Sequence, residues 1–227
     1  MPRPSPSRPS FAGAGARESG IIRDEPWFER LSGGHVVTDT PELHARALAR
    51  FGEKVEAIRD DQWHAPTPCS EWDVRDLVNH LVSENAWMPP LFEGKTVAEV
   101  GSSFDGDLLG EDPKGAWRRS AAAAEAAVRG DGVMERPVHI SMGDVPGADY
   151  TEQVLADLAI HGWDLARAIG ADDTIDPVLL DAVEPFYERV MAMWKLSGAF
   201  GGDVDPPEGS DRQTRLLALL GREAWGS

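Results

Sequence analysis

Apolar residues recur every three or four positions over most of the chain after residue 39. In the segment 40–60 they are Leu48, Phe51, Val55 and Ile58. This spacing places one apolar stripe along an otherwise polar helix. Thr40 and Pro41 are residue types that begin helices, as a cap and as the first turn. The pattern therefore predicts a first amphipathic helix that starts at Thr40 and packs its stripe against a core.

A second helix is predicted from Asp73, which we expect to cap it, to Pro89 and Pro90, which we expect to stop it. An alanine-rich segment, residues 113–130, has the composition of a third helix. The connection between them is polar and rich in glycine. It is longer than the turns of an idealised bundle, which suggests a crossover or a loop that builds a site.

A fourth helix is predicted to begin at a capping pair, Asp149 and Glu152, and to end at Gly170. A further helix follows after residue 176 with a kink near Pro185, and a short one lies close to the C-terminus. Residues 133–147 differ, because proline and glycine interrupt a pattern that is typical of an extended segment.

These elements predict an all-α protein, a helical bundle that spans residues 39–227. Residues 1–38 are predicted to be a disordered N-terminal extension. Their first part is rich in Pro, Ser, Gly, Ala and Arg and cannot form a core. It also lacks the apolar region of a secretory signal.

Charge and composition limit the kinds of molecule that the protein can bind and the compartment that suits it. There are 39 acidic and 22 basic residues, and a net charge of −17 repels phosphate backbones, which argues against nucleic-acid binding. No segment approaches the roughly 20 apolar residues of a membrane span. The single cysteine, Cys69, excludes a disulfide framework and suits a cytoplasmic protein. We expect it to pack as a small apolar residue.

Asp157 and His161 stand four positions apart on the predicted fourth helix, so their side chains share one face. Val154, Leu158 and Leu165 surround them, which indicates a face that is at least half buried. A buried carboxylate is costly without a partner. A metal cation would be such a partner and would also bind the imidazole. A plain Asp–His hydrogen bond fits the same spacing, so the spacing alone leaves both interpretations open.

His80 adds a third candidate ligand. It lies on the apolar stripe of the predicted second helix, beside Leu77 and Leu81, where a lone histidine is more often a core residue than a ligand. Two histidines and one carboxylate are, however, a familiar set for zinc, and they also suit nickel or iron. Three protein ligands leave positions open for water or a thiolate, as in catalytic sites. We therefore predict a metal site made by His80, Asp157 and His161.

Four other residues are weaker candidates for supporting this site or lining a pocket: Glu84, His139, Trp163 and Asp164. Glu84 follows His80 by one helical turn. Asp164 follows His161 by three positions and is suited to orient an imidazole, although a capping or surface role explains it equally well. His139 alternates with apolar residues in the extended segment. Trp163, like the other tryptophans, is most simply a core residue or a wall of the site.

The remaining histidines and two arginines need no functional role. His35, His44 and His64 have polar neighbours in the sequence. Arg75 and Arg167 are candidate contacts for an anion, and salt bridges explain them equally well.

Three runs of sequence carry a family resemblance: PTPCSEWDVRDLVNHLV, AIHGWDLARAIG and RLLALLGREAW. They resemble the actinobacterial metal-binding proteins of the mycothiol-dependent maleylpyruvate isomerase type, within the DinB/YfiT-like superfamily. The resemblance implies a four-helix bundle in up-down-down-up order. It also implies a divalent metal, usually zinc or nickel, on His80, Asp157 and His161. Members of this type usually carry Glu where Asp157 stands, a side chain one methylene longer.

The resemblance implies a metal-dependent transferase or isomerase that uses a low-molecular-weight thiol such as mycothiol and acts on a small electrophilic substrate. The same ligands suit a metal-dependent hydrolase, in which the metal activates water. A non-enzymatic module that binds or senses a small molecule is the third alternative. A homodimer through a helix face is compatible with the sequence, but no exposed apolar stripe predicts one.

Overall fold

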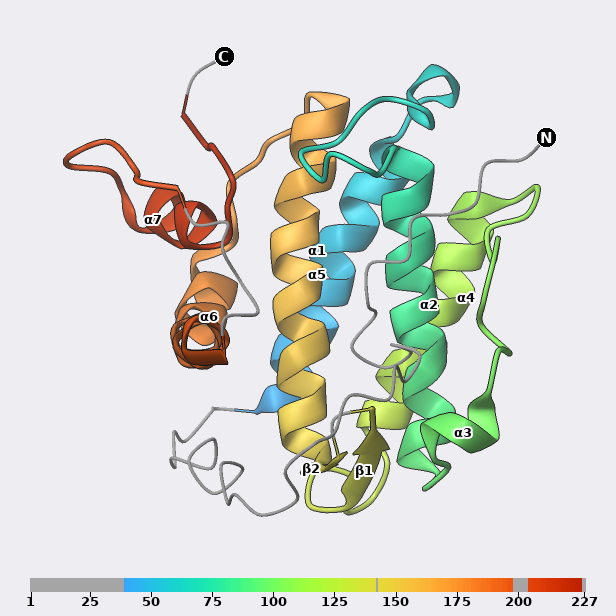
Figure 1. The fold of residues 1–227 in the computed structure, drawn as a ribbon. Helices are drawn as coiled ribbons and strands as arrows, with labels where there is room; N and C mark the ends of the chain where they lie inside the picture. The colour runs from blue at the N-terminus through green and yellow to red at the C-terminus, as the bar shows by residue number, and fades with distance from the viewer. Residues whose placement is uncertain (1–38, 142, 198–203, 226–227) are drawn as a thin grey trace.

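Four long helices form a bundle in the computed structural model, which describes residues 39–141, 143–197 and 204–225. They are α1 (Thr40–Ala57), α2 (Val74–Phe92), α4 (Pro113–Val128) and α5 (Gly147–Ile169). Followed along the chain, they run up, down, down and up in Figure 1. This order confirms the predicted all-α, DinB-like bundle. The prediction of disorder for residues 1–38 lies outside the described residues.

The core lies where the apolar stripes of the four helices meet. Helix α1 packs mainly against α5 and α2 mainly against α4, while contacts of α1 with α4 and of α2 with α5 close the ring. Val55, Leu81 and Leu155 are among its fully buried residues. The α2–α5 contact brings the two helices with the predicted metal ligands side by side.

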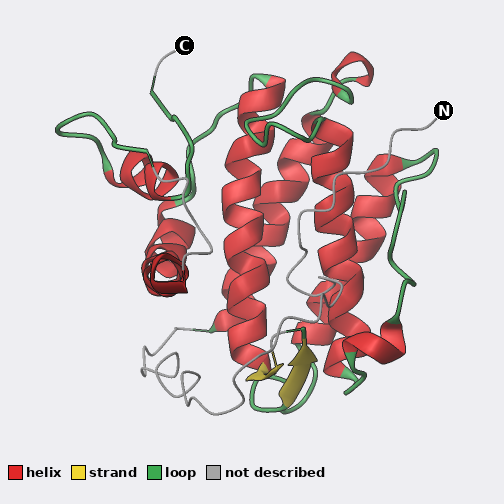
Figure 2. Ribbon diagram, viewed as in Figure 1, coloured by secondary structure: helices red, strands yellow, loops and turns green. Residues whose placement is uncertain are grey.

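Further elements cap and flank the bundle (Figure 2). The loop from α1 to α2 contains a 3₁₀ helix, η2 (Asp60–Gln62), and α3 (Val97–Val100) lies in the connection from α2 to α4. Strands β1 (Pro137–Ile140) and β2 (Gly143–Pro146) form an antiparallel hairpin, which confirms the predicted extended segment. Helices α6 (Pro177–Ser197) and α7 (Arg212–Leu219) follow α5, and α6 is seen nearly end-on against the upright bundle in Figure 1.

The predicted ends of the first two bundle helices need correction. Asp39, not Thr40, caps α1, because its carboxylate accepts a hydrogen bond from the backbone N–H of Glu42. Pro89 and Pro90 do not stop α2 but lie inside its last turns. Both prolines lack a backbone donor but keep their carbonyls, which here accept the N–H groups of Glu93 and Lys95 that close the helix. Asp73 does cap α2, as predicted.

Helix α5 also begins earlier than predicted. It starts at Gly147 and has no side-chain cap, so Asp149 and Glu152 are not a capping pair. The hairpin segment performs the cap instead, because the carbonyls of Arg136 and Met134 accept the first N–H groups of the helix. Gly170 ends α5 in the left-handed conformation, as predicted. None of the described helices is both long enough and apolar enough to span a membrane.

Two glycines of α5 are expected to respond in opposite directions to alanine substitution. A Cβ at Gly147 would lie 2.0 Å from the carbonyl oxygen of Val133, whereas one at Gly162 would lie 3.8 Å from the nearest atom, in the ring of Phe51. Gly147→Ala therefore forces the backbone apart and is expected to cost about 1–3 kcal/mol. Gly162→Ala is expected to stabilise the helix by up to about 1 kcal/mol.

Urea unfolding of the full chain measures both changes in the free energy of unfolding. A destabilising Gly162→Ala, or a Gly147→Ala without effect, would contradict the packing described for α5.

Candidate metal site

The structure brings the three predicted ligands together. His80 extends from α2, and Asp157 and His161 extend from successive turns of α5. His80 Nε2 lies 3.7 Å from Asp157 Oδ2, and the two imidazole rings are 5.3 Å apart between centroids in an edge-to-face arrangement. One ligand atom from each residue lies within 4.8 Å of the other two. These three residues are called the triad below.

The triad is shielded but reachable from solvent. The side chains of His80, Asp157 and His161 are 14%, 19% and 11% exposed. Burial alone would raise the pKa of Asp157, but its polar contact with His80 and the charge of His161 outweigh burial and hold that pKa below its usual range. Asp157 is therefore ionised at neutral pH and can act as an anionic ligand.

The triad fits a divalent cation better than a simple hydrogen-bonded pair. The separation of 3.7 Å between His80 Nε2 and Asp157 Oδ2 is too long for a good hydrogen bond. Two atoms that each lie about 2.1 Å from one tetrahedral ion are about 3.4 Å apart, close to the separation seen here. Two imidazole nitrogens and one carboxylate oxygen are also donors that zinc, nickel and iron accept.

Asp164 supports one of the triad histidines from behind. Its Oδ2 lies 2.9 Å from His161 Nδ1, and its side chain is fully buried. Burial would raise the pKa of Asp164, but the charge of Arg222 and the hydrogen bonds from His161 and Arg222 hold it far below its usual range. An ionised carboxylate only accepts hydrogen bonds, so Nδ1 of His161 is the donor in this contact, and Nε2 is the nitrogen left for a metal.

Cys69 does not pack as an apolar residue, contrary to expectation. Its sulfur lies 3.3 Å from Asp164 Oδ2, 3.9 Å from His161 Nδ1 and 3.7 Å from Arg222 Nη2. Cys69, His161 and Asp164 also have spacing that could hold a metal. However, Arg222 already binds both oxygens of Asp164, and its positive charge disfavours a cation there. The triad is therefore the better candidate.

Two aromatic residues complete the surroundings of the triad. Trp72, in the loop before α2, has its ring centroid 4.8 Å from that of His80 and 5.6 Å from that of His161. Tyr187 of α6 is buried, and burial together with the charge of Asp157 raises its pKa well above the usual value. Tyr187 is therefore protonated at neutral pH. Sequence reasoning treated Trp72 as one core tryptophan among several and had no signal for Tyr187.

The other predicted supporting residues fall into two groups. Glu84 is buried on α2 near His80. Burial lowers the pKa of His80, but the contact with Asp157 and the charge of Glu84 raise it, and the net shift is upward. His139 instead pairs with Asp144 across the hairpin, with 2.7 Å between Nδ1 and Oδ1. The hairpin joins the first residue of α5, about 15 Å along the helix from Asp157, so the structure does not bring His139 to the triad.

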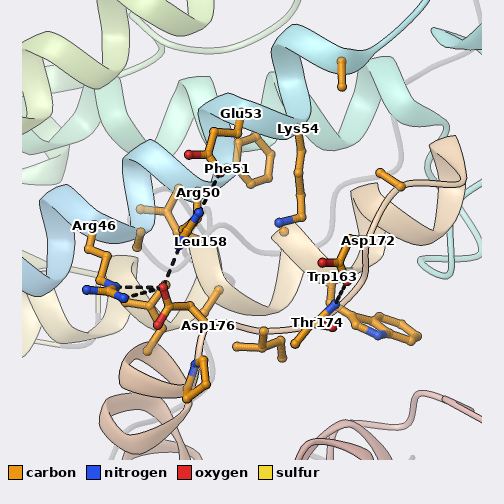
Figure 3. Close-up of a pocket in the computed structure, with 18 residues that line it drawn as sticks. Arg46, Arg50, Phe51, Glu53, Lys54, Leu158, Trp163, Asp172, Thr174 and Asp176 are labelled. Atoms are coloured by element: carbon orange, nitrogen blue, oxygen red, sulfur yellow. Dashed lines mark hydrogen bonds and ion pairs between the residues drawn. The ribbon is translucent and has the colours of Figure 1, made fainter.

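Trp163 and the two arginines also point away from the triad. Trp163 is buried and lines a separate cavity of about 420 Å³ between α1, α5 and residues 171–177 (Figure 3). Arg167 lies over the Trp163 ring and pairs with Asp173, and Arg75 pairs with Asp107. The salt-bridge interpretation of both arginines is therefore the correct one.

Several of the charged groups that line the cavity form ion pairs with one another. Asp176, at the start of α6, accepts hydrogen bonds from Arg46 Nε at 2.8 Å and Arg50 Nε at 3.2 Å (Figure 3). Arg50 also pairs with Glu53. These contacts tie α6 to α1, so we assign them a structural role and keep the triad as the candidate site.

Comparisons with known proteins agree with this fold. The family model of the mycothiol maleylpyruvate isomerase N-terminal domain matches residues 44–166. Two uncharacterised Mycobacterium tuberculosis proteins, from strains CDC 1551 and H37Rv, are each 30% identical over 187 residues, which is 79% of this chain and 95% of each relative. The crystal structure of the mycothiol-dependent maleylpyruvate isomerase, and that of a histidine-to-alanine mutant, match with a TM-score of 0.56 at 15% identity over 72% of both chains.

His44 is a buried histidine outside the triad, although it has polar neighbours in the sequence. Its side chain is fully buried, and neither ring nitrogen has a hydrogen-bond partner among the described residues. Burial, with a smaller contribution from the charge of Arg129, lowers the pKa of His44 to about 4. His44 is therefore neutral in the folded protein.

His44 is expected to make the protein less stable in mild acid. In the unfolded chain the imidazole of His44 binds a proton near pH 6.5, whereas in the folded chain it binds one only near pH 4. Stability is therefore lost as the pH falls through this window, by up to about 3 kcal/mol at about 1.4 kcal/mol per pH unit. Urea unfolding between pH 7.5 and 4 is expected to show a free energy of unfolding that falls less steeply with decreasing pH in His44→Leu than in the wild type. His64→Leu, at a side chain that is 79% exposed, is the control. Equal slopes in His44→Leu and wild type would contradict the burial of a neutral imidazole.

Proposed function

The chain belongs to the mycothiol maleylpyruvate isomerase N-terminal domain family, and from that premise we propose that it is a divalent-metal-binding protein that works with a low-molecular-weight thiol. The activity we propose is that of a transferase or isomerase acting on a small electrophilic substrate. The observation that carries the metal proposal is the convergence of His80, Asp157 and His161, with ligand atoms within 4.8 Å of one another.

The metal would be held by the Nε2 atoms of both histidines and by the carboxylate of Asp157. Zinc is the first candidate, and nickel or iron suits the same donors. A cation bound there would supply Lewis acidity, which lowers the pKa of a coordinated thiol or water and polarises a substrate oxygen. Three protein donors leave room for such a ligand.

The surrounding residues have three supporting roles in this proposal. Tyr187 is protonated and would be a donor available to the carboxylate of Asp157, and Asp164 holds the His161 ring through Nδ1. Trp72 covers both imidazoles on the side of the α1–α2 loop and limits access of water. The partial exposure of the triad leaves a path for a thiol and a substrate.

The name of the family supports mycothiol as the thiol, and the two solved relatives are described as mycothiol-dependent maleylpyruvate isomerases. A single cysteine in the chain and a low-molecular-weight thiol both suit the reducing cytoplasm, where we propose that the protein acts. We take the folding unit to be residues 39–227.

Metal analysis of the untagged full chain tests the ligand assignment. We expect about one equivalent of zinc, nickel or iron in the wild type, and its loss in His80→Ala and in His161→Ala, because each change removes one of three donors. His139→Ala is the matched control, since it also removes a histidine paired with an aspartate but lies away from the triad. Elemental analysis of the folded proteins gives the stoichiometry.

Absence of metal in the wild type after incubation with excess zinc and nickel would overturn the metal proposal and favour a binding or regulatory module. With metal present, turnover of an electrophilic substrate that requires added thiol supports the transferase or isomerase. Ester or amide turnover without thiol would instead favour a metal-dependent hydrolase. Thiol-dependent turnover that survives in both histidine variants would contradict the role of the triad.

A further inference from the structure

Arg222 reaches the metal site from the far end of the chain. It follows α7 and lies outside the segment that matches the family model, residues 44–166. Its Nε donates to Asp164 Oδ1 at 3.0 Å, and its Nη2 donates to Asp164 Oδ2 at 2.8 Å. The two side chains are 15% and 0% exposed, so this is a buried, two-pronged ion pair.

The arginine fixes the plane of the carboxylate that holds His161. Oδ1 of Asp164 accepts a hydrogen bond from Arg222 Nε. Oδ2 accepts hydrogen bonds from Arg222 Nη2, from the ring of His161 and from the thiol of Cys69. A fully buried carboxylate without a positive partner is strongly destabilised, and the guanidinium is the cation that compensates it. Without the two-pronged contact, the carboxylate would lose both its compensating charge and the donors that set its orientation.

Arg222 is itself held firmly. Its backbone N–H donates to the carbonyl of Leu217, and its Nη1 donates to the carbonyl of Leu220 at 3.1 Å. Gly221 adopts a positive φ of 77°, a conformation that favours glycine and turns the chain back at the end of α7. Leu217 is fully buried. The guanidinium is therefore held by a segment that packs against the end of α7.

We propose that Arg222 is a positioning residue of the metal site: it holds Asp164 against Nδ1 of His161, so that His161 presents Nε2 to the metal. This inference rests on the proposed metal function. It adds that the C-terminal segment completes the site, and that residues 44–166 alone do not carry a fully oriented ligand set. A purely structural ion pair would stabilise the fold without affecting the ligand.

The first test uses the wild-type, metal-free protein and needs no variant. Long-range ¹H–¹⁵N spectra of the imidazole rings at about pH 8.5, where an ordinary histidine is neutral, report which nitrogen carries the proton. We expect His161 to be protonated on Nδ1. A spectrum of His161 with the proton on Nε2 would overturn the proposal, whatever the metal content.

The second test compares metal affinity in folded variants, measured by zinc competition with a chelator. Arg222→Gln removes both the positive charge and the two-pronged contact with Asp164. We expect the Kd for zinc to rise about 10–100-fold, as is typical when a group that orients a metal ligand is lost. Arg222→Lys keeps the charge but not the two-pronged geometry, so a smaller rise is expected.

Arg212→Gln is the matched control on α7. Arg212 also forms two ion pairs, with Asp181 and Glu184, but it does not contact Asp164. We expect it to lower Tm and to leave the Kd for zinc unchanged. Should Arg222→Gln fail to fold, Arg222→Lys and the wild-type spectrum still decide the question.

The outcomes separate this inference from the proposed function. A Kd that is unchanged in Arg222→Lys and Arg222→Gln, with only Tm lowered, would show a structural ion pair and overturn the positioning role while the metal function stands. Failure of the wild type to bind either zinc or nickel would overturn the proposed function, and the tautomer of His161 would then still test the geometry around Asp164.

Discussion

Helix α5 is buried along most of its length, and two of its carboxylates, Asp157 and Asp164, lie at the candidate site. Each carboxylate needs positive charge or hydrogen-bond donors, and the rest of the structure is arranged around that need. Asp164 receives a guanidinium from the C-terminal segment. Asp157, among the described residues, has only the imidazole of His80 as an ion-pair partner, at a distance too long for a good hydrogen bond. The difference between the two carboxylates is the physical basis for placing a metal at Asp157 and not at Asp164.

Local spacing identified the three candidate ligands, because each lies on a recognisable face of its own helix, although spacing alone left a metal and a plain hydrogen bond open. Asp157 and His161 share a face four positions apart, and His80 lies on the apolar stripe of the helix that packs against them. The order of the bundle followed from the resemblance. By contrast, Tyr187 and Arg222 reach the site through α6 and the segment after α7, whose positions no local pattern encodes. The contact between Arg222 and Asp164 joins residues 58 positions apart.

The mistakes also have physical causes. His44 has polar neighbours in the sequence, yet it stands four positions before Leu48 on the stripe of α1, so its burial was readable from the spacing. Helix ends were misplaced where backbone groups of another segment replaced a side-chain cap, as at Gly147. Cys69 was judged from composition, whereas its polar surroundings arise only when the loop before α2 meets α5.

The ion pair between Asp164 and Arg222 also constrains how this chain can diverge. Removing one partner of a buried pair costs about 3–5 kcal/mol, a large share of the stability of an ordinary domain. A lineage that lost the arginine would therefore be under immediate pressure to lose the aspartate, and with it the orientation of His161. We therefore expect positions 164 and 222 to change together, although the family model ends at residue 166.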